Sequence, residues 1–229
     1  MAYIINLDLR GKKAVVVGAG TVAARKVRDL LAAGAAVTVV APEVCEEIRQ
    51  AASEGGLLLI ERRFQKGDMR EARVAVCATN DEEVNRQVAE EGNSLGCLVN
   101  VVDRPALCDF TVPATLKRGA LTIAVTTEGR CPSLAGLLRE ELGELYGEEY
   151  GALVETMGRI RGEMIAKGWE SSRIREALAA LYKKNILKMA AARQEKRVSP
   201  PRHQDTKGII TGRTGRKVRR KTLDVRRKT

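Results

Sequence analysis

Five short apolar runs, each rich in Val, Leu, Ile or Ala, divide the first hundred residues of the chain. They cover residues 13–17, 37–40, 57–60, 74–78 and 97–102. Apart from Lys13, Thr38 and Asn100, each run is apolar throughout and does not alternate with polar residues. Such runs are typical of strands in a parallel sheet covered by helices on both faces. Their shortness and β-branched content also favour strands over helices.

Three of the four segments between these runs are predicted to be helices. In residues 21–33 apolar positions recur at helical intervals between Lys and Arg, and Gly34 follows as a C-terminal cap. A second helix is predicted to carry Pro42 in its first turn and to run to about Ser53, and a third to cover residues 81–95. This alternation of strand and helix predicts an α/β fold with a doubly wound parallel sheet.

The pattern changes after Asp103. Residues 110–113 and 121–126 are predicted to be strands that flank a basic turn, Lys117-Arg118-Gly119. Helices are predicted from Pro132 through Leu145, over 151–167 and over 171–192. The expected parts are therefore a sheet domain (1–112), a central region (113–147), a helical module (148–192) and a tail (193–229).

The net charge of +11 is concentrated in that tail. Residues 193–229 hold 14 Lys and Arg against 3 Asp and Glu, so the preceding 192 residues are neutral. A basic arm can bind nucleic acid through counterion release, but this one has no interleaved aromatic residues for base stacking. We therefore favour a disordered, solvated tail and do not expect nucleic acid as a partner.

Other features of the composition exclude several protein classes. No apolar run approaches the roughly 20 residues of a membrane span, and the N-terminus lacks a basic region followed by a long apolar run. We therefore expect a cytoplasmic protein that does not enter membranes. The five cysteines form no CxxC pair and the single histidine is His203, which favours reduced thiols and predicts no metal site.

The sequence Gly18-Ala19-Gly20-Thr21-Val22-Ala23 fits the dinucleotide-binding pattern GxGxxG/A, between the first strand and the first helix. Gly18 permits a tight turn, Gly20 lets a diphosphate approach the backbone, and Ala23 lets the helix pack on the strand. The helix N-terminus offers unpaired N–H groups to the phosphates. A glycine-rich turn without a ligand is the alternative.

The acid that usually binds the ribose should end the second strand. Here the strand ends Val40-Ala41-Pro42, so Glu43 comes about one residue late. A favourable acid in the first turn of a helix is an equal alternative for Glu43. No Arg follows the strand to accept a 2′-phosphate, so NAD is favoured over NADP.

Asp103 follows the fifth predicted strand, at the edge of the sheet where ligands bind in open α/β folds. A carboxylate there can accept a proton while a hydride leaves to a nicotinamide. The alternative from the residues alone is a loop Asp that shapes the turn before Arg104-Pro105.

Several blocks of the sequence resemble the precorrin-2 dehydrogenase family, which includes the N-terminal half of bifunctional siroheme synthase. The opening block is residues 5–12 together with 15–26. The later blocks are Ala78-Thr79-Asn80-Asp81, Asn100-Val101-Val102-Asp103, Cys108-Asp109-Phe110-Thr111-Val112-Pro113-Ala114 and Pro132-Ser133-Leu134-Ala135. We expect no C-terminal methyltransferase.

The resemblance implies a Rossmann domain, a central dimerisation region and a helical module that closes the site. It implies that precorrin-2 loses a hydride to NAD, and protons, to give sirohydrochlorin, with Asp103 as the catalytic group in a homodimer. The cofactor contacts that it implies fall on Thr21, Val22, Pro42 and Glu43, and we expect Thr79 to be a further cofactor-binding residue. Some relatives also insert iron into sirohydrochlorin, so Fe²⁺ is a candidate chelatase substrate.

The implied substrate is a polycarboxylate, so its site needs cations. Arg104, Lys117, Arg118 and Arg130 are the candidates, although most exposed Lys and Arg are only solvated charges. The segment Thr126–Pro132 departs from the family, because Glu128 and Arg130 add charges there and Cys131 replaces a hydroxyl.

Three rival functions remain at this point: an NAD-sensing Rossmann module without catalysis, a nucleic-acid-binding protein driven by the tail, and a chelatase that has lost its redox role.

Overall fold

The computed structural model describes the backbone of residues 3–198 and the side chains of residues 3–185. The predicted basic tail therefore lies outside the described residues, apart from the backbone of 193–198. The chain forms two compact units, Met1–Glu155 and Thr156–Thr229, each of which is described by itself.

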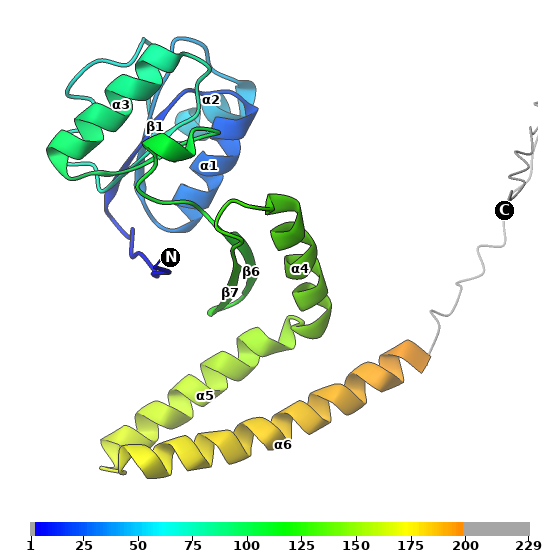
Figure 1. The fold of residues 1–229 in the computed structure, drawn as a ribbon. Helices are drawn as coiled ribbons and strands as arrows, with labels where there is room; N and C mark the ends of the chain where they lie inside the picture. The colour runs from blue at the N-terminus through cyan, green and yellow to red at the C-terminus, as the bar shows by residue number, and fades with distance from the viewer. Residues whose placement is uncertain (1–2, 199–229) are drawn as a thin grey trace, which may run out of the picture. The chain divides into compact units, whose positions relative to one another are not determined.

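A five-stranded parallel sheet, of which β1 is labelled in Figure 1, forms the centre of the first unit. Its strand order is β3-β2-β1-β4-β5. Its strands are β1 (Lys13–Val17), β2 (Ala36–Val40), β3 (Leu58–Ile60), β4 (Val74–Cys77) and β5 (Leu98–Val101). All five predicted strands are present and parallel. The doubly wound fold class is thereby confirmed.

Helices cover both faces of this sheet because successive residues of each strand point to opposite faces. On one face, Val16 and Val39 pack with Val27 of α1 (Thr21–Ala32) and Ile48 of α2 (Glu46–Ser53). On the other, Val15, Val17 and Val99 pack with Val88 of α3 (Glu82–Leu95). The two aliphatic clusters fix the strands, and the strands fix the loops at their ends.

The predicted start of α2 is wrong. The helix begins at Glu46, and residues 42–45 form a loop whose last amide, Cys45 N, donates a 2.9 Å hydrogen bond to Ala19 O. The alternative that Glu43 is an acid in the first turn of this helix is therefore also wrong, because the acids of the first turn are Glu46 and Glu47.

The predicted hairpin is present, but its first strand is displaced along the sequence. The strands are β6 (Ala114–Arg118) and β7 (Leu121–Val125), so the two basic residues of the predicted turn lie in β6. Residues 110–113 are not a strand, because Asp109 and Phe110 are hydrogen-bonded to β5 and Pro113 has no N–H to donate. Gly119, with φ +56°, provides the turn, and α4 (Pro132–Leu145) follows the hairpin.

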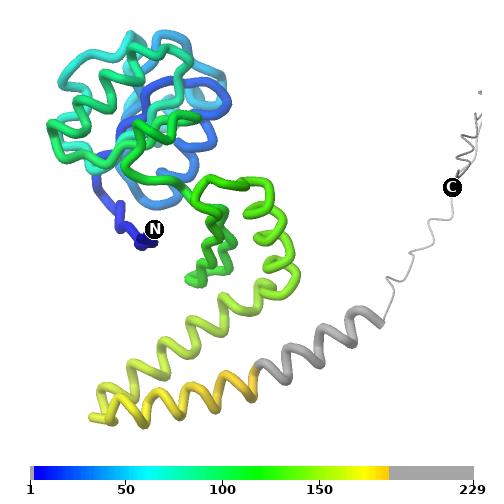
Figure 2. The backbone as a smooth tube through the Cα atoms, in the orientation of Figure 1, coloured from blue at the N-terminus to red at the C-terminus, as the bar shows by residue number. Residues whose placement is uncertain are grey.

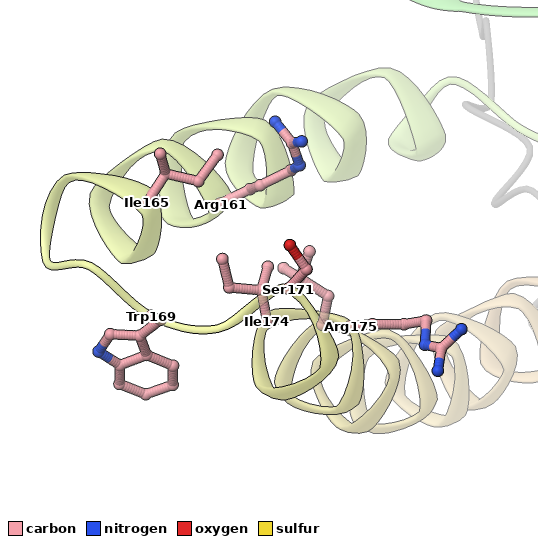
Figure 3. Close-up of a pocket in the computed structure, with 7 residues that line it drawn as sticks. Arg161, Ile165, Trp169, Ser171, Ile174 and Arg175 are labelled. Atoms are coloured by element: carbon pink, nitrogen blue, oxygen red, sulfur yellow. The ribbon is translucent and has the colours of Figure 1, made fainter.

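Two further helices, α5 (Glu149–Ala166) and α6 (Ser171–Val198), continue the chain, and its direction reverses between them (Figure 2). Both helical stretches were predicted, although α6 extends past residue 192. In the second unit, Ile165 of α5 and Ile174 of α6 line a pocket of about 530 Å³ with Arg161, Arg175 and Trp169 (Figure 3). None of the predicted site residues is among the residues that line this pocket. Within the described part of the chain, no helix is both long enough and apolar enough to span a membrane.

Candidate active site

The order of the strands reverses direction between β1 and β4. After β1 the chain adds β2 and β3 on one side, and it then returns to add β4 and β5 on the other. Because all five strands are parallel, the loops after β1, β4 and β5 lie side by side at one edge of the sheet. Ligands of doubly wound folds bind at this switch point. Gly18, Thr79 and Asp103 follow these three strands.

Gly18 is fixed by two neighbouring strands. Its N–H donates a 2.9 Å hydrogen bond to Val40 O of β2, and its φ is +99°, a conformation that side chains rarely adopt. A Cβ on Gly18 would overlap Ala78 O, immediately after β4. Only glycine fits here, and it brings the loop against the end of β4.

Gly20 leaves space where a diphosphate would approach. A Cβ on Gly20 would meet no atom within 4 Å, and the residue is exposed. It is the N-cap of α1, no side chain caps this helix, and its first turn holds no acid. The first N–H groups of α1, with their partial positive charge, are therefore available to an anion. The predicted phosphate loop has the geometry that a dinucleotide requires.

The other members of the glycine loop divide between binding and packing. Thr21 and Val22 are exposed at the N-terminus of α1, whereas Ala23 is fully buried against the sheet. Pro42 and Glu43 are exposed after β2, in the loop that Cys45 ties to the glycine loop. These two residues therefore lie on the β2 side of the switch point.

Thr79 lies on the other side, after β4. Its Oγ1 accepts a 3.1 Å hydrogen bond from Asp81 N, and Asp81 caps α3 by accepting from Glu83 N and Val84 N. The N-terminus of α3 is thus already neutralised by a side chain, in contrast to that of α1. At this edge of the sheet, the uncapped start of α1 is the better site for the phosphates.

A buried polar pair supports the turn after β4. The Cys77 thiol donates a 3.1 Å hydrogen bond to Asn85 Oδ1, and Asn85 Nδ2 lies 3.4 Å from Thr79 O. Burial raises the pKa of Cys77 to about 12, so this thiol stays protonated and is not a nucleophile at neutral pH. Sequence reasoning missed Asn85, which interrupts the apolar face of its helix.

Asp103 lies two residues after the end of β5, in a left-handed conformation with φ +58°. Hydrogen bonds from Val102 N to Cys77 O and from Arg104 N to Val101 O hold the turn. The side chain is exposed, and its carboxylate takes part in none of the hydrogen bonds or ion pairs found among the described residues. A carboxylate in this state is available to accept a proton from a substrate.

The four candidate cations differ in their surroundings. Arg104 pairs with Glu82 at 2.7 Å, which ties the Asp103 loop to the start of α3. Arg118 donates to Tyr146 O and Gly143 O and pairs with Glu148, so it holds the end of α4. Lys117 on β6 and Arg130 in the loop before α4 are exposed. Only Arg104 is next to Asp103 in the chain, and the contacts of Arg118 are those of a structural residue.

A second hollow, of about 710 Å³, opens at the amino ends of β1 and β2, where Lys13 and Ala36 are among the residues that line it. It therefore lies at the edge of the sheet opposite the glycine loop. Among the described residues, no group of three or more His, Cys, Asp or Glu is placed to hold a metal ion.

Comparison with known proteins gives consistent matches. Residues 5–114 match a family model described as putative NAD(P)-binding. The siroheme synthase of Psychrobacter cryohalolentis is 40% identical over 165 residues, which are 72% of this chain and 32% of that protein. The siroheme synthase of Pseudomonas aeruginosa strain UCBPP-PA14 is 42% identical over 154 residues, which are 67% of this chain and 33% of that protein. The chain thus spans about a third of the length of these curated relatives.

A solved structure covers more of the chain. SirC, a precorrin-2 dehydrogenase, superposes with a TM-score of 0.67 and 33% sequence identity, over 79% of this chain and 89% of that one. The match extends over almost all of that protein and includes more than the dinucleotide-binding sheet. From this identity and coverage it follows that the chain belongs to the precorrin-2 dehydrogenase family.

Proposed function

We propose that this chain oxidises precorrin-2 to sirohydrochlorin in siroheme biosynthesis, with NAD as the hydride acceptor. One observation carries the proposal: the uncapped N-terminus of α1 shares one edge of the parallel sheet with the Asp103 carboxylate, which has no partner among the described residues. Relatives named siroheme synthase and precorrin-2 dehydrogenase support the choice of substrate.

The residues at the switch point fit the dinucleotide. The N–H groups at the start of α1 would bind the diphosphate next to Gly20. Thr79, which follows β4, would contact the dinucleotide on the β4 and β5 side of the switch point. When bound, NAD supplies the carbon that accepts the hydride. Because exposed Glu43 follows β2 and no cation stands beside it in sequence, a 2′-phosphate would meet repulsion there, which favours NAD over NADP.

Asp103 would act as the general base. As the hydride leaves precorrin-2, a proton must also leave, and the carboxylate of Asp103 accepts it. The Arg104–Glu82 ion pair holds the loop that carries Asp103 beside the start of α3. Of the four candidate cations, Lys117 and Arg130 are exposed and would bind the carboxylates of the substrate. Arg104 could turn toward those carboxylates only by releasing Glu82.

Incubating the full chain with precorrin-2 and NAD tests this function. We expect NADH and the absorption spectrum of sirohydrochlorin to appear together, in equal amounts. An NAD-sensing module would bind NAD and form no NADH, and a pure chelatase would consume sirohydrochlorin and Fe²⁺ but not precorrin-2. Either of these results would overturn the dehydrogenase. Chelatase activity on Fe²⁺ and the cytoplasmic location stay predictions.

A homodimer is part of the proposal. Leu134, Leu137, Leu138 and Leu145 recur at helical intervals on α4, and all four are exposed, Leu137 by 59% and Leu145 by 60%. An apolar stripe of this kind is typical of a surface that another protein covers. A second copy of the chain is the partner that the family resemblance implies for this central region.

A further inference from the structure

We propose that Cys108 is the positioning residue for Asp103, because its thiol closes the loop that carries this carboxylate. The assignment of a catalytic effect rests on the proposed function, but the contacts of the thiol do not. Cys108 follows Asp103 by five residues, and its side chain is half-buried under the loop.

The thiol reaches both ends of the loop. Cys108 Sγ lies 3.2 Å from Val101 N and 3.1 Å from Val101 O at the end of β5, and 3.3 Å from Arg104 O after Asp103. Asn100 Nδ2 adds a fourth contact at 3.6 Å. A thiol offers one weak donor and a weak acceptor, so it can accept from Val101 N while its proton serves one of the two carbonyls.

The position of β5 explains why the loop needs this thiol. The strand is the edge of the sheet. The backbone N–H and C=O groups of Val99 and Val101 point away from β4, to the side where no further strand follows. Asp109 satisfies Val99, since Asp109 N donates to Val99 O and Asp109 Oδ2 accepts from Val99 N, both at 2.8 Å. Cys108 does the same for Val101 with its side chain. Cys108 and Asp109 thus replace a neighbouring strand.

The consequence falls on Asp103. A non-glycine residue in the left-handed region persists only where its surroundings fix it, and Asp103 has φ +58°. Without the thiol, Val101 N loses its acceptor, although Val101 O still accepts from Arg104 N. Among the described residues, the turn through Asp103 is then held by backbone hydrogen bonds and the exposed Arg104–Glu82 pair alone. The carboxylate would then sample positions away from the substrate.

The first test measures the loop directly and needs no turnover. In Cys108→Ala, amide hydrogen exchange of Val101 and of the loop through Cys108 should speed up at least tenfold, and Cys108→Ser should restore much of the protection. Cys97→Ala is the matched control, since Cys97 is a second cysteine beside β5, and among the described residues its thiol makes a single hydrogen bond, to Leu98 O at 3.8 Å. Unchanged exchange in Cys108→Ala would overturn the proposal, whether or not the chain oxidises precorrin-2.

The second test separates positioning from folding. In the full chain, Cys108→Ala should lower kcat for precorrin-2 by about 10- to 100-fold, as expected for a small misplacement of a reacting group, while the Kd for NAD stays unchanged. Cys108→Ser should recover most of this rate. In an Asp103→Asn background, Cys108→Ala should have no further effect, because there is no base left to misplace. An equal loss in both backgrounds would show a general structural role and refute positioning.

Discussion

Gly18 and Asp103 both have positive φ, but for different physical reasons. At Gly18 the angle of +99° and the closeness of Ala78 O, which a Cβ would overlap, leave no alternative to glycine. At Asp103 the angle of +58° is one that Asp tolerates better than most residues, so the side chain can be chosen for its chemistry. The loop geometry at one residue serves packing, and at the other it presents a carboxylate.

The proposed role of Asp103 predicts a specific kinetic defect. Replacement by Asn or Ala should lower kcat for precorrin-2 oxidation by about 10²- to 10⁴-fold, the usual contribution of a general base. The Kd for NAD should change little, because the phosphate loop is on β1. Steady-state NADH formation together with NAD titration measures both quantities. Near-normal turnover by Asp103→Ala would remove Asp103 from the mechanism.

The sequence predicts the role of a residue where that role depends on a local motif, and fails where the role depends on contacts with residues distant in the chain. The pattern Gly18-Ala19-Gly20 and the position of Asp103 after an apolar run were enough to propose both. The pairing of Arg118 with Tyr146 O and Glu148 depends on residues about 30 positions away, so the sequence could not separate a structural arginine from a substrate-binding one.

Among the helices of the sheet domain, α1 and α3 differ in whether a side chain caps the N-terminus. Asp81 caps α3, whereas α1 begins at a bare Gly20 with no acid in its first turn. A helix start without a cap forgoes some stability but keeps its N–H groups for an anion. This contrast is the reason for proposing that the N-terminus of α1 binds the diphosphate.

That contrast leads to a prediction for Gly20→Asp. The backbone at Gly20 (φ −82°, ψ −172°) suits Asp at an N-cap, and nothing lies within 4 Å of its Cβ position. Thermal unfolding should therefore show unchanged or slightly higher stability, by a few tenths to about 1 kcal/mol. NAD binding should be lost, because the new carboxylate occupies and repels the phosphate position. Retained NAD affinity would show that the diphosphate binds elsewhere.

A loop near the amino ends of the strands yields a pH-dependent prediction. Asp68 accepts two hydrogen bonds from the Arg62 guanidinium and one from Gln65 N. Chiefly through Arg62, the pKa of Asp68 is lowered in the folded chain in spite of partial burial. A carboxylate with a lowered folded pKa stabilises the fold at neutral pH, and that contribution disappears as the pH falls through the folded value.

Asp68→Asn should therefore lower the free energy of unfolding at neutral pH by about 1–2 kcal/mol. The difference from the unmodified chain should shrink as the pH falls below the ordinary Asp value of about 4. Denaturant titrations at several pH values give this comparison. If the difference instead remained constant down to strongly acid pH, the ion pair would not be its cause.

The pattern of apolar residues predicted β1, β2, β4 and β5 because these strands are mostly buried on both faces, and burial of that kind leaves a continuous signal. The edge strand β3 is also apolar in sequence, although Leu58 is exposed. The pattern failed at α2 and at the hairpin, where local residues were misleading. Pro42 suits a helix start, but the amide of Cys45 donates a hydrogen bond to Ala19 O of the glycine loop. The helix therefore begins only at Glu46. The predicted strand at 110–113 is instead attached to the edge of β5.

For the whole molecule, the exposed leucine stripe of α4 is the feature that the isolated chain does not explain. Its leucine stripe lies between the sheet domain and α5 in sequence, in the region that the family resemblance assigns to dimerisation. The proposed dimer would cover this stripe, and the transfer of exposed leucine side chains out of water is its main driving force.

Leu137→Asp should dissociate this dimer and leave each protomer folded. Leu137 is 59% exposed, so the charge costs little in the monomer, but in a covered interface it would be desolvated and unpaired. We expect the dimer dissociation constant to rise about 100-fold or more, equivalent to roughly 3 kcal/mol. Leu58→Asp is the matched control, because Leu58 is 60% exposed on the edge strand β3 and outside α4. Sedimentation at several concentrations measures the change. A dimer that survives Leu137→Asp, or one that Leu58→Asp disrupts equally, would place the contact on another surface.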